Sequence, residues 1–244
     1  MTKLSVNVNK VATLRNTRHN GIPSVVKAAK LCLEAGAHGI TVHPRPDERH
    51  IRPSDVCELA ELLKDFPNAE YNIEGNPFEG RYVELIRQVR PTQCTLVPDD
   101  PSAFTSNQGW DVRQEADRLK EMIGILKDFG SRVSIFLNAD STMVPFAAKA
   151  GADRIELYTE PYAQAFDIGQ AERGVRPFAD AARIASECGL GVNAGHDLSR
   201  QNLPMFLTQV SGVLEVSIGH ALIADALEIG YTATVRGFLD VIKS

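Results

Sequence analysis

The sequence predicts a single α/β domain of the (β/α)8 TIM barrel class, spanning residues 1–244 with extra helical and loop segments. Eight short apolar runs alternate with amphipathic helical patterns along the whole chain, as expected for repeated strand–helix units. A length of 244 residues fits one such barrel. No GxGxxG sequence follows the first apolar run, which disfavours a dinucleotide-binding sheet.

The predicted strands are short, so length and β-branched content identify them better than alternation does. They cover residues 4–7, 39–42, 71–73, 94–97, 133–137, 154–157, 191–193 and 214–218. The segments LEAGAHGITVH (33–43) and AKAGADRIELY (148–158) both pass through Ala-Gly-Ala into a strand. Glycine there provides the left-handed residue that ends a helix, which supports a repeated unit.

Helical spacing of apolar residues connects these strands. Residues 56–63 and 203–210 each place apolar side chains at i, i+3, i+4 and i+7. Asn202 and Pro204 suit the start of the second of these helices, and Gly130 suits the end of a helix that includes 116–126. Two connections, 98–110 and 158–174, are longer than the rest and leave the C-terminal ends of strands. Long loops at that face contact or cover substrates, so we expect both at the site.

The composition disfavours several classes of protein. The formal net charge is −5 and there is no long basic run, which argues against a nucleic-acid partner. No segment approaches about 18 consecutive apolar residues, and the first residues lack the apolar region of a signal peptide, so we expect a cytoplasmic protein without a membrane partner. The four cysteines include no CxxC pair, and we expect reduced core residues.

Polar residues and glycines gather where the predicted strands end. In a parallel barrel this face carries the reacting groups. The residues at or near these ends are Asn7, His43, Glu74, Asn138, Glu156, His196, Asp197, Gly219 and His220.

The residue types at this face suit proton transfer. Histidine changes charge near neutral pH, and a glutamate in a crowded barrel mouth can have a raised pKa. His43, Glu74 and His196 therefore suit a reaction that moves several protons. Taken alone, each has a structural explanation: Glu156 could be satisfied by polar groups in the barrel, and Arg49 could simply lie in solvent. Their convergence on one rim favours catalysis.

Two glycines predict an anion site. Gly195 and Gly219 end the last two strands, and a helical run begins after Gly219. Backbone N–H groups at a helix start bind anions, and phosphate sites of barrels recur after these strands. Arg18 and Arg45 add guanidinium groups that suit phosphate. Ordinary turn formation is the alternative for the glycines.

Other barrel chemistries fit less well. A Schiff-base enzyme needs a lysine on a strand, but Lys10 lies past the first strand. No HxH sequence occurs and no aspartate ends a strand. We expect acid/base catalysis with no cofactor and no metal; a divalent metal held by His43, Glu74, Glu156 and His196 is the alternative.

Seven motifs, in this order, resemble the pyridoxine 5′-phosphate synthase family nearly end to end: VNVNKVATLRNTR, GITVHPRPDERHI, NIEGN, CTLVP, IELYTE, VNAGHDL and IGHALI. The resemblance implies condensation of 1-deoxy-D-xylulose 5-phosphate with 3-amino-2-oxopropyl phosphate. The products would be pyridoxine 5′-phosphate, phosphate and water, in vitamin B6 biosynthesis. It also implies a homo-octamer whose partners are two small phosphorylated substrates.

The resemblance further implies a role for each matched residue. His43 and Glu74 would be general bases, and His196 the general acid. Glu156 would hold or stabilise the transition state. The amino-ketone phosphate would be bound by Asn7, Arg18, the backbone of Asp197, Gly219 and His220. The sugar phosphate would be bound by Arg45, His50 and Thr105, the last in a loop that closes over the site in the family.

Two departures from the family leave alternatives open. This chain has Asn9-Lys10 where many members have Asp-His, and Asp197 where glycine is common. Lys10 would then be able to donate to a phosphate. One alternative is another phosphate-binding barrel enzyme, such as an isomerase or aldolase of a sugar phosphate. The other is a barrel that binds a ligand without catalysis.

Overall fold

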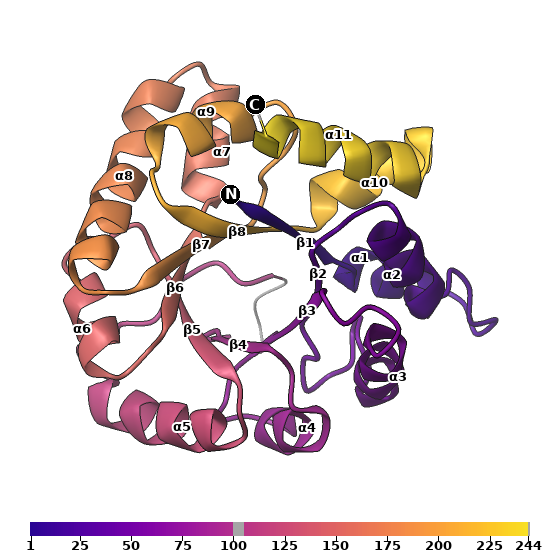
Figure 1. Ribbon diagram of the computed structural model, residues 1–244. Helices are drawn as coiled ribbons and strands as arrows, with labels where there is room; N and C mark the ends of the chain where they lie inside the picture. The colour runs from indigo at the N-terminus through magenta and orange to yellow at the C-terminus, as the bar shows by residue number, and fades with distance from the viewer. Residues whose placement is uncertain (100–104, 244) are drawn as a thin grey trace.

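The computed structural model, which describes residues 1–99 and 105–243, is a closed barrel of eight parallel strands surrounded by helices (Figure 1). The strands are neighbours in chain order, and β8 pairs with β1. Their bounds are Lys3–Asn7 (β1), Gly39–Val42 (β2), Glu70–Gly75 (β3), Gln93–Leu96 (β4), Arg132–Leu137 (β5), Arg154–Tyr158 (β6), Gly191–Gly195 (β7) and Val213–Ile218 (β8). The TIM barrel prediction is confirmed, and every predicted strand overlaps an observed one.

The helices pack their apolar sides on the barrel. Their bounds are Asn9–Asn16 (α1), Val25–Glu34 (α2), Pro53–Leu63 (α3), Tyr82–Val89 (α4), Ala116–Asp128 (α5), Val144–Lys149 (α6), Glu160–Asp167 (α7), Ala171–Glu187 (α8), Leu203–Gln209 (α9), His220–Ile229 (α10) and Tyr231–Lys243 (α11). In α8 the buried residues Val175, Phe178 and Ala182 recur at helical spacing. Gly130 follows the end of α5 with φ +91°, as its predicted role requires.

Three strands are followed by an extra helix before the outer helix that covers the barrel. These are α1 after β1, α7 after β6 and α10 after β8. The predicted long connection 158–174 is therefore largely the helix α7, which corrects the expectation of a loop. Glu160 and Pro161 explain the helix start, because a carboxylate and a residue without an N–H both suit a first turn.

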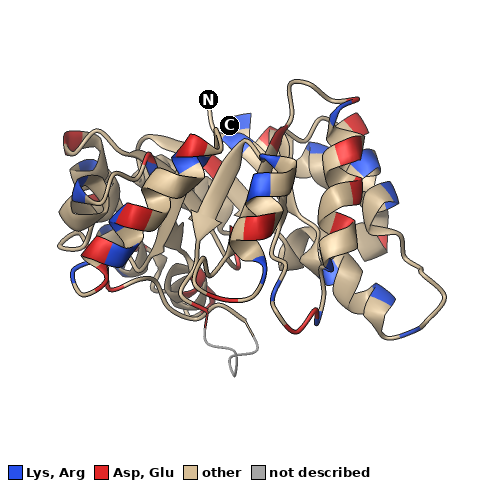
Figure 2. Cartoon of the chain, turned by 90° about the horizontal axis from the view of Figure 1, so that it is seen from below, with Lys and Arg blue, Asp and Glu red and all other residues tan. Residues whose placement is uncertain are grey.

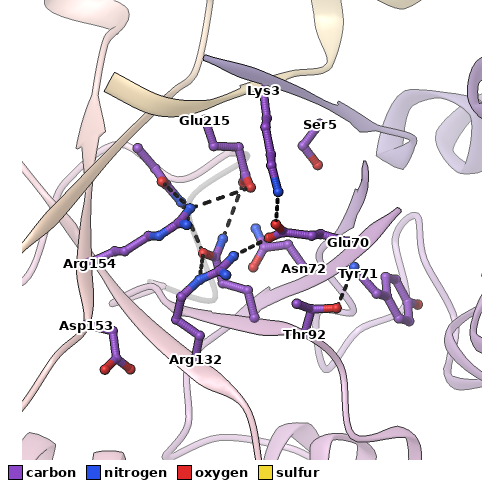
Figure 3. Close-up of polar contacts among 12 residues, drawn as sticks. Lys3, Ser5, Glu70, Tyr71, Asn72, Thr92, Arg132, Asp153, Arg154 and Glu215 are labelled. Atoms are coloured by element: carbon purple, nitrogen blue, oxygen red, sulfur yellow. Dashed lines mark hydrogen bonds and ion pairs between the residues drawn. The ribbon is translucent and has the colours of Figure 1, made fainter. Parts of the chain in front are cut away.

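A network of charged and amide side chains fills the barrel at the N-terminal ends of the strands (Figure 3). Arg132 pairs with Glu70 and donates through Nε to Gln93 (2.9 Å). Gln93 donates to Glu215 (3.3 Å), and Arg154 lies 3.9 Å from the same carboxylate. Because these buried and half-buried groups satisfy one another, this end of the barrel serves stability, and the opposite end is left for ligands.

The four cysteines are free. Cys32 and Cys94 are buried, whereas Cys57 and Cys188 are only half-buried. The prediction of reduced cysteines is confirmed, and their placement in the core is right for two of them. Burial raises the pKa of the Cys32 and Cys94 thiols to about 12, so neither is a nucleophile at neutral pH.

The surface mixes charges of both signs. Acidic and basic side chains are interspersed along the outer helices (Figure 2), with pairs such as Arg183–Glu187 (2.6 Å) one turn apart. Within residues 1–99 and 105–243, no helix combines the length and apolar character that a membrane crossing needs.

Replacing Gly124 with alanine is expected to stabilise the protein by up to about 1 kcal/mol, because glycine is a poor helix former. Gly124 lies on the exposed side of α5, and an added Cβ would meet no atom within 4 Å. Urea unfolding at neutral pH measures the change. A loss of stability would mean that this face of α5 is covered.

Candidate active site

A cavity of about 400 Å³ opens at the C-terminal ends of the strands. Of the predicted site residues, all except Arg18 line it: Asn7, His43, Arg45, His50, Glu74, Thr105, Glu156, His196, Asp197, Gly219 and His220. Residues that lie up to about 200 positions apart in the chain thus meet in one cavity, as the barrel rule predicts.

Arg18 is placed differently from the other predicted residues. It is exposed, in the turn after α1, and does not border the described cavity. Lys10, from the first turn of α1, lines the cavity instead. Arg49 also lines it and pairs with Asp47 (2.6 Å), so the expectation that it lies simply in solvent is corrected. The assignment of Arg18 to a phosphate stays a prediction.

His43 lies between two carboxylates directly after β2. Its Nδ1 is 3.5 Å from Glu74 Oε2, and its Nε2 contacts Asp99. Its backbone N–H donates to Asn9 Oδ1 (3.0 Å), which fixes the start of the loop. Burial alone would lower the pKa of His43, but Asp99 and Glu74 outweigh it and raise the pKa to about 9. In the ligand-free protein His43 is therefore a cation at neutral pH and acts as a base only after its surroundings change.

Asp99 was not predicted, although it lies just past β4. Its Oδ1 accepts hydrogen bonds from Arg45 Nη2 (2.9 Å) and Ser106 Oγ (3.0 Å). Burial would raise the pKa of Asp99, but His43 and Arg45 together lower it below its ordinary value. The available signal was that Asp99 follows the CTLV run within a few residues, and so lies near the rim to which His43 belongs. No observed strand ends in an aspartate, as predicted, but Asp99 reaches the site from the loop that follows β4.

Glu156 points from β6 into the barrel and is buried. Burial, followed by the charges of Glu74 and Glu215, raises its pKa well above the ordinary value. Thr95 Oγ1 lies 3.3 Å from Glu156 Oε2 and 3.0 Å from Asn72 Oδ1. A protonated Glu156 can donate to Thr95 while Thr95 donates to Asn72, so the single hydroxyl proton suffices. The raised pKa favours the protonated form of Glu156, which can act as a hydrogen-bond donor.

Replacing Gly195 with alanine is expected to displace Glu156. A Cβ at Gly195 would lie 2.3 Å from Glu156 Oε1, far inside van der Waals contact. We expect a loss of about 1–3 kcal/mol in the free energy of unfolding, as for other overpacked cores, and a large loss of turnover. Urea unfolding and steady-state rates measure both. Gly124→Ala, at an open position, is the control. If both variants changed stability and turnover equally, the close approach of Gly195 to the Glu156 carboxylate would be contradicted.

The turn after β7 holds His196 under strain. His196 and Asp197 have φ of +87° and +60°, a region that residues other than glycine rarely adopt. His196 Nδ1 is 3.1 Å from Asp197 Oδ2, and its Nε2 is 3.0 Å from Thr105 Oγ1. The hydrogen bond with His196 lowers the pKa of Asp197 and outweighs burial, which alone would raise it. The imidazole is thus held from both nitrogens and faces the cavity.

Groups that attract anions lie on two sides of the cavity. On one side, the first turn of α10 starts at Gly219, where an added Cβ would lie 3.2 Å from the Asn7 side chain. On the other side lie Arg45 and His50. Burial, then the charges of His43, Arg45 and Lys10, lower the pKa of His50 to about 3. His50 is therefore neutral; burial is the main cause of the low pKa, and the positive charges around it add to the effect.

The family described as "Pyridoxal phosphate biosynthesis protein PdxJ" matches residues 4–244. The chain belongs to this family. It is 56% identical over 242 residues to pyridoxine 5′-phosphate synthase of Albidiferax ferrireducens, covering 98% of this chain and 96% of that relative. Pyridoxine 5′-phosphate synthase of Bacteroides thetaiotaomicron is 53% identical over 243 residues, with 100% of both chains covered. The predicted family is confirmed, and this chain is an enzyme of vitamin B6 biosynthesis.

The fold also resembles solved barrels outside the PdxJ family. The 3-keto-L-gulonate-6-phosphate decarboxylase from Vibrio cholerae superposes with a TM-score of 0.67 at 8% identity, covering 99% of this chain and 97% of that one. At this identity the likeness shows the shared fold alone.

One cluster at the mouth of the PdxJ-family site has the composition of a metal site. Potential ligand atoms of Glu160, His196 and Asp197 all lie within 4.8 Å of one another. Histidine and carboxylates together can bind a divalent cation. The alternative predicted set of His43, Glu74, Glu156 and His196 does not form such a cluster in the described part of the chain.

Proposed function

We propose that the chain condenses 1-deoxy-D-xylulose 5-phosphate with 3-amino-2-oxopropyl phosphate to give pyridoxine 5′-phosphate, phosphate and water, by acid/base catalysis through its own side chains. The observation that carries the proposal is one cavity in which His43, His196, Glu74 and Glu156 lie between two anion-attracting sides. Membership of the PdxJ family supports the same product.

The two sides of the cavity suit two phosphorylated substrates. Arg45, His50 and Thr105 would hold the sugar phosphate, with Lys10 close enough to add positive charge. The backbone at Gly219 and Asp197, with Asn7 and His220, would hold the amino-ketone phosphate at the start of α10. The reacting carbons would then lie near Glu156, His43 and His196. Arg18 would contribute only after a change in the turn that follows α1.

The catalytic groups match the protons that the condensation must move. Attack of the amine on the sugar ketone gives a carbinolamine, and its loss of water needs an acid, a role that suits His196. Proton removal next to the resulting imine needs a base, which suits Glu74 and, in its neutral form, His43. Glu156 would donate a hydrogen bond to the oxygen on which negative charge develops. Each step uses a group that faces the cavity.

The test is turnover by the purified protein with both substrates. Phosphate release and the ultraviolet absorbance of a pyridine ring should rise together, and only when both substrates are present. A folded protein that forms no product would reject the proposal. Turnover of a single phosphorylated sugar without the amine would support an isomerase or aldolase instead.

We further propose a cytoplasmic homo-octamer, on the strength of the family. Large apolar side chains that remain exposed on one chain support association: Ile168 is 70% exposed and Leu227 is 74% exposed. Light scattering coupled to size-exclusion chromatography gives the mass in solution. A monomer at micromolar concentration would reject the assembly.

A further inference from the structure

We propose that Asp99 is a positioning residue that mimics a phosphate. In the ligand-free protein its carboxylate lies between His43 and Arg45, in the position where a phosphate group of the substrate binds. The inference rests on the proposed function, because it concerns how the sugar phosphate enters the same cavity. It assigns to Asp99 the role of an internal competitor, displaced when the phosphate binds.

The contacts of Asp99 are those of an anionic ligand. One oxygen accepts from Arg45 Nη2 at 2.9 Å and from Ser106 Oγ at 3.0 Å, and the other contacts His43 Nε2. A carboxylate with two acceptor oxygens on a guanidinium and an imidazole offers the acceptors that a phosphate oxygen pair would offer. Arg45 and Ser106 line the cavity, so the phosphate reaches both from the side where substrate enters.

Burial makes the two anions compete. Asp99, His43 and Arg45 are 9%, 4% and 5% exposed, respectively. Water therefore screens little of the repulsion between Asp99 and a phosphate that binds Arg45. Both anions cannot hold the same groups at once, so the phosphate binds only as Asp99 leaves. The measured affinity is then reduced by the fraction of molecules in which Asp99 is in place.

The exchange also changes the surroundings of His43. Among the described residues, the charged and titratable groups near it are Asp99 after β4, Glu74 on β3, Arg45 and His50 on its own loop, and Lys10 on α1. Asp99 supplies the largest part of the stabilisation of the His43 cation. Its departure leaves Glu74 beside Nδ1, which is the arrangement in which His43 can hand a proton on and then act as a base.

The substitution Asp99→Asn tests the inference by calorimetric titration with inorganic phosphate and, separately, with 1-deoxy-D-xylulose 5-phosphate. Asparagine keeps the shape but removes the charge, so both ligands should bind about 10-fold more tightly. The KM for the sugar phosphate should fall while that for the amino-ketone phosphate stays unchanged. Binding equal to or weaker than that of the wild type would overturn the inference.

The His43 resonances give a second readout that a purely structural role would not move in the same way. In protein with labelled histidine, nuclear magnetic resonance titration should show a His43 pKa near 9 in the wild type. In Asp99→Asn it should be lower by about 1 unit or more. An unchanged pKa would show that Asp99 does not hold His43 and would overturn the inference.

The control is Asp140→Asn, which removes one negative charge at the same end of the barrel. Asp140 is exposed and accepts from the Thr142 backbone N–H (2.9 Å), a bond that asparagine retains. It should leave phosphate binding and the His43 titration unchanged. Asp99→Ser, which keeps a hydroxyl near Arg45, replaces Asp99→Asn if the latter does not fold. Inorganic phosphate binding requires no turnover, so a failure of the proposed reaction and a failure of this inference are separate results.

Discussion

Replacing Glu156 with glutamine is expected to stabilise the protein at alkaline pH and to remove most of its activity. The pKa of Glu156 is raised in the folded protein, so the folded state holds its proton after the unfolded state has lost it. Stability from this group is therefore complete at acid pH and is lost as pH rises from about 4.5 through the folded pKa. Glutamine donates to Thr95 as the protonated acid does, but never ionises.

The size of the effect should grow with pH. At pH 5 the two proteins should unfold at nearly the same urea concentration, whereas at pH 9 the glutamine variant should be more stable by about 1–3 kcal/mol. Turnover should fall about 100-fold or more if Glu156 must also exchange its proton during the reaction. Urea unfolding at pH 5, 7 and 9 and steady-state rates at the same pH values give both quantities.

Glu61→Gln is the matched control for the stability measurement. Glu61 is exposed and pairs with Lys64 on the surface of α3, so its removal should not change how stability depends on pH. Parallel pH dependence in Glu156→Gln and the wild type would mean that Glu156 is ionised in the folded protein. The role of Glu156 as a neutral donor would then be wrong.

The residues at the strand ends could be predicted from the sequence because the repeated strand–helix unit determines which residues face the same end of the barrel. Once eight apolar runs are read as barrel strands, the residues after each run must share one rim, whatever their separation in the chain. That rule brought His43, Glu74 and His196 together correctly. It uses only where a strand ends, which is the feature that apolar run length defines best.

The repeat does not predict how far each loop extends past its strand, and therefore which loop side chains reach the cavity. Arg18 lies two residues past the end of α1, and a shift of a few residues decides whether a guanidinium enters the cavity. His43 directly follows β2, whereas Asp99 lies three residues past β4, in a Pro-Asp-Asp sequence that is also typical of an ordinary turn. Its importance depends on the partners His43 and Arg45, which come from another strand. The helix α7 was missed because Tyr158–Gly174 lacks the long apolar period of an outer helix.

Replacing His196 with asparagine is expected to lower kcat about 100-fold or more, with little change in stability. Asparagine is the suitable replacement because it tolerates positive φ better than alanine, and His196 has φ +87°. Its amide can keep the hydrogen bond that Nδ1 makes with Asp197, but it does not reach Thr105 and cannot transfer a proton. The KM for either substrate should change less than kcat, since the imidazole acts on the reacting atoms and not on a phosphate. Single-turnover rates and urea unfolding give the two quantities.

His19→Asn is the same substitution at an exposed position on the segment before α2, outside the described cavity. It should leave kcat, KM and stability unchanged. If His196 only positioned the substrate, His196→Asn would show the opposite pattern, a raised KM with kcat retained. The variant would then have lost binding that is equal in the ground state and the transition state, and proton transfer would be intact. The two variants together therefore separate proton donation from binding at the strained turn after β7.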